Sequence, residues 1–116
     1  MTEIKIIKEL ISRTELKRLA SAQFGNIIKA VVDIRQEIVS VGGELHSDME
    51  VLLVESENSK REDTWGINLY LDETGEGFIE FDSMVNLKPM HDNRTRNVES
   101  EAIQKKIKEI INRIVK

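Results

Sequence analysis

Residues 42–50 read GGELHSDME and carry, at alternate positions, four side chains that can bind metals or transfer protons: Glu44, His46, Asp48 and Glu50. A histidine together with carboxylates suits a divalent ion such as zinc or manganese. Zinc sites in proteins usually have two or more histidine or cysteine ligands, and the only other histidine is the distant His91. A divalent metal site at Glu44 and His46 is therefore one interpretation of this stretch.

The other interpretation is the start of a helix. Ser47 and Glu50 have the S-x-x-E spacing of a capping box, in which both side chains bind free backbone amides. Asp48 would then lie in the first turn, where the helix dipole favours negative charge. The neighbouring apolar residues fit a hydrophobic staple and a buried helical stripe: Leu45, Met49, Leu52 and Leu53. Capping leaves Glu44 and His46 unexplained.

Two later stretches predict a hairpin with one polar face. Residues 64–71, TWGINLYL, alternate as a strand does, and DETGEG then turns the chain. Residues 78–89, FIEFDSMVNLKP, predict a second strand that bulges near Asp82 and Ser83 and ends at Pro89. The shared face would carry four polar side chains: Asn68, Tyr70, Glu80 and Asp82. Such a face is either the solvated side of a sheet or the lining of a ligand groove.

The polar loop after this hairpin carries two arginines before a predicted helix. Its centre is the sequence Asn93-Arg94-Thr95-Arg96. Two guanidinium groups beside the free amides of a helix start can hold phosphate or carboxylate. We therefore predict an anion site at Asn93, Arg94 and Arg96, and the structural alternative is pairing of these arginines with acidic neighbours such as Asp82.

Length and composition predict a single domain over residues 1–116. The net charge of -4 and the pI near 5.3 disfavour duplex DNA as a partner. The absence of cysteine excludes disulfides and thiolate chemistry. The N-terminal MTEIKIIKELISR lacks the apolar core of a signal peptide, and no segment approaches the roughly 20 apolar residues of a membrane span. We therefore expect a cytoplasmic protein with no membrane partner.

Hydrophobic periodicity and capping predict the remaining elements. A strand is expected at residues 4–10, followed by a helix that begins with the capping box of Ser12 and Glu15. Gly25-Asn26 would end this helix. A final helix is expected over residues 98–115, with isoleucines on its buried face: Ile103, Ile107, Ile110, Ile111 and Ile114.

Residues 27–41 fit either a helix or a hairpin. Their many Ile and Val residues favour a hairpin with strands at 29–34 and 38–41, because β-branched side chains pack well on a pleated surface. With this choice the fold class is α+β, in the order β-α-β-β-α-β-β-α. The expected architecture is an antiparallel sheet of about five strands with three helices on one face.

Four short stretches, GGELHSDME, WGINLYL, IEFDSMVNLKP and DNRTRNVES, resemble in collinear order those of a small prokaryotic family known only as a domain of unknown function. The resemblance covers nearly the whole chain. It implies a stand-alone protein and carries no activity with it. It also points to the polar stretches that capping and core packing leave unexplained.

Catalytic motifs are absent from the sequence: there is no G-x-S-x-G elbow, no G-x-G-x-x-G and no Walker motif. We therefore expect a small binding or interaction protein without intrinsic catalysis or a bound cofactor, which recognises a phosphate-bearing ligand or a protein partner. The alternative is a metal-dependent hydrolase that uses Glu44, His46 and Asp82. A hydrolase would need the GGELH segment, the polar sheet face and the arginine loop to meet in one cleft.

Overall fold

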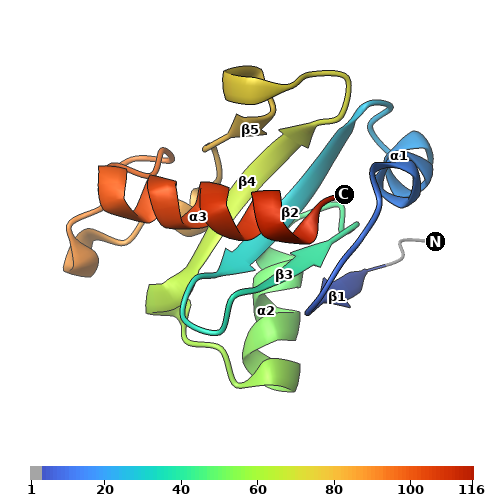
Figure 1. Cartoon of the computed structure of the whole chain (residues 1–116). Coiled ribbons are helices and arrows are strands. Elements are labelled where there is room, and N and C mark those ends of the chain that lie inside the picture. Colours follow the sequence, from blue (N-terminus) through green and yellow to red (C-terminus); the bar gives the residue numbers. More distant parts are fainter. Residues whose placement is uncertain (1–3) are drawn as a thin grey trace.

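A five-stranded antiparallel sheet organises the molecule, whose computed structural model describes residues 4–116 (Figure 1). The strands lie in the order β1-β3-β2-β4-β5, and every neighbouring pair is antiparallel. Their bounds are β1 Lys5–Ile7, β2 Ile27–Asp33, β3 Ile38–Val41, β4 Thr64–Tyr70 and β5 Ile79–Glu80. Together with three α-helices, this sheet confirms the predicted α+β class.

The helices pack on both faces of the sheet, so the prediction of one covered face is wrong. They are α1 Arg13–Ser21, α2 His46–Glu57 and α3 Glu101–Ile114. Leu16 of α1 and Ile107 of α3 belong to the larger core with alternate residues of β2 and β4. Met49 and Leu53 of α2 pack against Val31 from the opposite face of β2. Figure 1 shows α3 crossing one face, with α2 on the other. Because β2 buries apolar side chains on both faces, Ile28, Ala30 and Val32 on one and Val31 on the other, each face needs a helix to cover it.

Residues 27–41 form the predicted hairpin, not a helix. The turn is fixed by Asp33, whose Oδ1 accepts hydrogen bonds from the amides of Arg35 at 2.9 Å and Gln36 at 3.1 Å. Glu37 completes the turn in the left-handed region, with a φ of 59°. The central strand β2 therefore pairs on both sides, with β3 and with β4.

The predicted strand over residues 78–89 is wrong after its first part, since only Ile79–Glu80 pairs as β5. Beyond it the chain forms two 3-10 turns, η3 Met84–Asn86 and η4 Pro89–His91. The side chain of Asn86 replaces the missing strand partner: its Oδ1 accepts from the Gly66 amide at 2.8 Å, and its Nδ2 donates to the Gly66 carbonyl at 3.0 Å. The amide and the carbonyl of Gly66 at the edge of β4 thus have hydrogen-bond partners although no strand continues beside them. The first strand is also shorter than the predicted 4–10.

The predicted capping box at Ser47 is wrong, because α2 begins at His46 with Leu45 as its N-cap. Leu45 makes no side-chain capping bond and is 55% exposed, so it does not act as a staple either. The cap predicted at Ser12 is confirmed: its Oγ accepts from the Glu15 amide at 3.0 Å. The final helix begins later than the predicted residue 98, because Ser100 caps it by accepting from the Ile103 amide at 3.3 Å.

The longest helix in residues 4–116 is α3, with 14 residues. A helix needs about 20 residues to cross a bilayer. None of the helices in this part of the chain is both long and apolar enough to do so.

Candidate functional site

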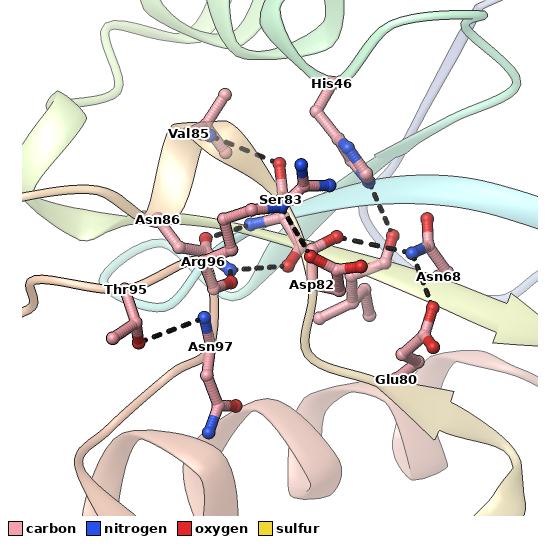
Figure 2. A network of polar contacts seen from close by, with 12 residues as sticks. His46, Asn68, Glu80, Asp82, Ser83, Val85, Asn86, Thr95, Arg96 and Asn97 are labelled. Carbon is pink, nitrogen blue, oxygen red and sulfur yellow. Dashed lines mark hydrogen bonds and ion pairs between the residues drawn. The ribbon is translucent and has the colours of Figure 1, made fainter.

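His46 stands at the first position of α2 and points at the sheet (Figure 2). Its Nε2 lies 2.8 Å from the carbonyl oxygen of Ile67 in β4. Because a carbonyl can only accept, Nε2 carries the hydrogen and Nδ1 of the neutral ring keeps a lone pair. Burial is the main cause that lowers the pKa of His46 below its usual value of 6.5. The imidazole is therefore neutral at pH 7.

Arg96 reaches the same region from the loop before α3. Its Nε donates to Asp82 Oδ1 at 2.7 Å, which is the ion pair that the structural alternative predicted. Its backbone carbonyl accepts from the Ser83 amide at 3.0 Å and from Asn86 Nδ2 at 2.9 Å. In Figure 2 the outer end of the Arg96 side chain lies on the side of Asp82 that faces His46. The loop backbone is thus fixed while part of the guanidinium group stays available.

A cavity of about 190 Å³, here called the His46 cleft, lies between these groups. Its polar lining comes from β2, from the start of α2 and from the segments around residues 83 and 96: Lys29, His46, Ser47, Ser83 and Arg96. Leu45 and Met84 form part of its apolar wall. Two of the polar side chains are cationic, and no carboxylate belongs to the lining. The lining therefore carries two positive charges, of which that of Arg96 is paired with Asp82 beside the cleft.

The predicted polar face of the hairpin is present next to this cleft. Asn68 lies opposite Glu80 in the β4–β5 register, and its Nδ2 donates to Glu80 Oε1 at 2.9 Å. The same Nδ2 is 3.3 Å from the carbonyl of Asp82, and Tyr70 donates its hydroxyl hydrogen to Glu80 Oε1 at 3.2 Å. Asn68 Nδ2, Tyr70 and Glu80 therefore pair with one another across the two strands, whereas the buried Oδ1 of Asn68 has no hydrogen-bond partner among the described residues.

The predicted anion loop is held together by its own side chains. Asn93 is buried, and its Nδ2 donates to the carbonyls of Asn86, Thr95 and Asn97 at 2.7, 3.1 and 2.7 Å. The carboxylate of Glu99 accepts from the amides of Arg94 at 2.6 Å and Thr95 at 2.9 Å. These contacts lower the pKa of Glu99 below its usual range. An internal carboxylate thus binds two amides of the loop itself, which precede the helix-start amides that we expected to meet a ligand, and Arg96 rather than Arg94 lines the His46 cleft.

The four acidic and imidazole groups of GGELHSDME do not gather. Glu44 and Asp48 are exposed, whereas His46 and Glu50 lie one helical turn apart on the sheet side of α2. Glu50 is 5% exposed and bonds Arg61 Nη1 at 2.8 Å and Thr64 Oγ1 at 2.6 Å, away from the His46 cleft. Among residues 4–116, no three His, Asp or Glu side chains lie close enough to hold a metal ion.

Residues 5–114 match the profile of a protein family described as "Protein of unknown function (DUF5674)". The chain belongs to this family. The match confirms the predicted membership of a family of unknown function and covers every strand and helix described above. Comparisons with curated proteins and with solved structures found no match. For this member of the DUF5674 family, functional inference therefore depends on the geometry of its own side chains.

Sequence reasoning missed three residues that shape the cleft in this family member. Lys29 is the one charged residue within the apolar run IIKAVV, and this position could have marked it as a residue with a special role. Ser83 and Gly66 gave no comparable signal, because their contact joins β4 to a segment 17 positions further along the chain. Only the folded chain brings such residues together.

Proposed function

We propose that this protein binds a small anionic ligand, with phosphate or carboxylate as the recognised group, in the His46 cleft. The observation that carries the proposal is the convergence of two cationic side chains, Lys29 and Arg96, on one cavity whose lining has no carboxylate. They come from β2 and from the loop before α3. A cavity of about 190 Å³ accommodates a phosphate group with a small attached moiety.

The ammonium group of Lys29 is a positive charge that a bound anion would neutralise. Within residues 4–116 no carboxylate pairs with its ammonium group, whose Nζ lies 5.3 Å from the centroid of the Phe24 ring. Arg96 uses its Nε for Asp82, and the remaining guanidinium hydrogens can bind an oxyanion. Two donors from separate elements of the lining would hold a phosphate or carboxylate more firmly than either one alone.

The start of α2 adds a favourable electrostatic field to these two charges. Leu45 provides no side-chain cap, so the first-turn amides keep no side-chain acceptor. Ser47, in the same turn, contributes a hydroxyl to the lining. The helix dipole and the free amides both favour negative charge at this end.

Binding fits the geometry better than metal-dependent hydrolysis does. His46 and Asp82 lie on the same side of the sheet, but Glu44 is exposed and His46 uses Nε2 for Ile67. Two cations beside the cleft would also oppose a divalent metal. The donor set therefore supports a binding protein that recognises an anion through Lys29 and Arg96.

Backbone amide chemical shifts of ¹⁵N-labelled protein during titration with inorganic phosphate, acetate and a nucleoside monophosphate test this proposal. We expect saturable shifts at Lys29, Ser47 and Arg96 that weaken with added salt, because partly exposed charges are screened over about 8–10 Å. Lys29→Gln combined with Arg96→Gln should abolish them, whereas Lys105→Gln, on the exposed side of α3, should leave them unchanged. Absence of saturable shifts, or their persistence in the double variant, would refute the proposal.

A further inference from the structure

A second cavity shares Met84 and Val85 of η3 with the His46 cleft. It has a volume of about 440 Å³ and is here called the Lys88 groove. Its walls come from α2, from η1 Arg61–Asp63 and from the segment of η3 and η4. This volume lies within the range of pockets that hold small ligands or peptide side chains.

Exposed apolar side chains gather at this groove. Met84 is 62%, Leu87 39% and Met90 93% exposed, and all three line it. They are three of the seven large apolar residues that residues 4–116 expose. Methionine side chains adapt their shape to a bound partner and are common at protein-binding surfaces. This part of the surface therefore favours contact with apolar side chains of a partner.

Lys88 places a buried ammonium group in the lining of the groove. It lines the groove although only 8% of it is exposed, and burial lowers the pKa of its ammonium group below the usual value. Its Nζ donates to the Val85 carbonyl at 2.8 Å and lies 5.0 Å from the centroid of the Trp65 ring. Among the described residues no carboxylate is within ion-pair distance of it. One of its three donors is thus used, and Glu50 and Asp63 act on this buried cation only from beyond ion-pair distance.

The backbone holds Lys88 in this position. Its amide donates to the Asn93 carbonyl at 2.8 Å, and its carbonyl accepts from the Asn93 amide at 3.1 Å. Arg61 and Glu50, which also line the groove, pair with each other at 2.8 Å, whereas the half-exposed Glu62 lies 4.0 Å from His91, an ion pair only when that ring is protonated. Lys88 is therefore a buried charge without a direct ionic partner among the described residues, and the backbone fixes its position before a ligand arrives.

We propose that the Lys88 groove docks a peptide segment of another protein, in which an acidic side chain is flanked by apolar residues. The carboxylate would pair with the Lys88 ammonium, and the apolar residues would cover Met84, Leu87 and Met90. Charge complementarity selects this occupant, because a purely apolar segment would leave Lys88 buried and unpaired. The inference does not rest on ligand binding in the His46 cleft, since neither cation of that cleft lines the groove, although Met84 and Val85 line both cavities.

Trp65 supplies a probe for the test, because it is the only tryptophan of the chain and Lys88 lies over its ring. Its fluorescence would be followed during titration with blocked octapeptides that carry leucines around one central residue, which is glutamate, glutamine or lysine. We expect the glutamate peptide to bind about tenfold more tightly than the glutamine peptide, as one charge-assisted hydrogen bond provides. Equal binding of these two peptides, or no binding of any, would refute the proposal.

Two variants separate charge recognition from folding. Lys88→Met should remove the preference for glutamate, and Lys88→Arg should keep it, with circular dichroism to verify the fold of both. Met90→Asp should weaken every peptide, whereas Leu10→Asp, at an exposed apolar residue outside the groove, should not. A glutamate preference that survives Lys88→Met overturns the proposal. So does self-association in sedimentation experiments that Met90→Asp abolishes, because the occupant would then be a second copy of this chain.

Discussion

Ser83 packs directly against the backbone of Gly66. A Cβ atom added at Gly66 would lie 2.5 Å from both Cβ and Oγ of Ser83 and 2.9 Å from Cγ2 of Val85. This contact seats the segment after β5 on the edge of β4, where Asn86 completes the hydrogen bonds of the same glycine. Ser83 and Val85 line the His46 cleft, and Val85 also lines the Lys88 groove. One close backbone approach therefore positions both candidate binding surfaces.

Gly66→Ala should destabilise the protein, because the new methyl group forces Ser83 away from β4. Overpacking of this kind costs about 1–3 kcal/mol, and urea denaturation would measure the loss. Gly77→Ala is the control, since its added methyl would meet no atom closer than 3.5 Å. Equal stability of Gly66→Ala and wild type would show that the segment is not seated as described.

Ile107→Ala should lower the free energy of unfolding by about 2–5 kcal/mol, because Ile107 is fully buried between α3 and the sheet. Ile103→Ala, at a partly buried position of the same helix, should lower the free energy of unfolding by less. Thermal and urea unfolding of both variants would measure the difference. A loss below about 0.5 kcal/mol at Ile107, the size of an ordinary surface change, would mean that α3 is not docked.

Ser12→Ala should cost about 0.5–2 kcal/mol, because its hydroxyl caps α1. Ser47→Ala should change stability by less than about 0.5 kcal/mol, because Ser47 lies inside the first turn of α2 and is exposed. The pair of chemical denaturation curves distinguishes a true N-cap from a serine that only has the right spacing. A larger loss at Ser47 than at Ser12 would reverse this assignment.

Asn93→Ala should destabilise the arginine loop, since three backbone carbonyls lose the donor that they share. We expect a loss of about 1–3 kcal/mol, the usual result of leaving buried polar groups unsatisfied. Arg94→Ala, whose side chain is exposed in the same loop, is the control and should stay within about 0.5 kcal/mol of wild type. Chemical denaturation of both variants measures this contrast, and similar effects at the two positions would contradict a structural role for Asn93.

Stability should fall as the pH drops below 6.5, in part because of His46. Its pKa is lowered in the folded state, so the unfolded chain takes up the proton first and acid favours unfolding. This contribution is present above pH 6.5 and is lost as the pH falls through the window below it. His46→Gln keeps a donor for Ile67 but does not titrate, so its stability should depend less on pH in that window. His91→Gln is the control, and an unchanged pH profile for His46→Gln would contradict the prediction.

The sequence by itself determined the elements whose signals are local. The Ser12 cap, the alternating strand at residues 64–71 and the isoleucine stripe of α3 depend on neighbours within a few positions, so periodicity and capping sufficed to predict them. The hairpin at residues 27–41 was also predicted, because its β-branched residues favour strands. The polar pairing of Asn68 with Glu80 followed from the alternation of the two strands.

Tertiary structure alone decided where α2 begins, how the chain leaves the sheet after Glu80 and which cations share a cleft. His46 enters α2 and bonds Ile67, so the helix begins one residue before the predicted cap. Asn86 binds Gly66 and makes a continued strand unnecessary. Glu99 binds the amides of Arg94 and Thr95 and closes the loop that the sequence predicted as an anion site. Each of these outcomes depends on a side chain that satisfies a particular backbone group. In two of the three, that group lies about 20 positions away in the chain, beyond the reach of any local pattern.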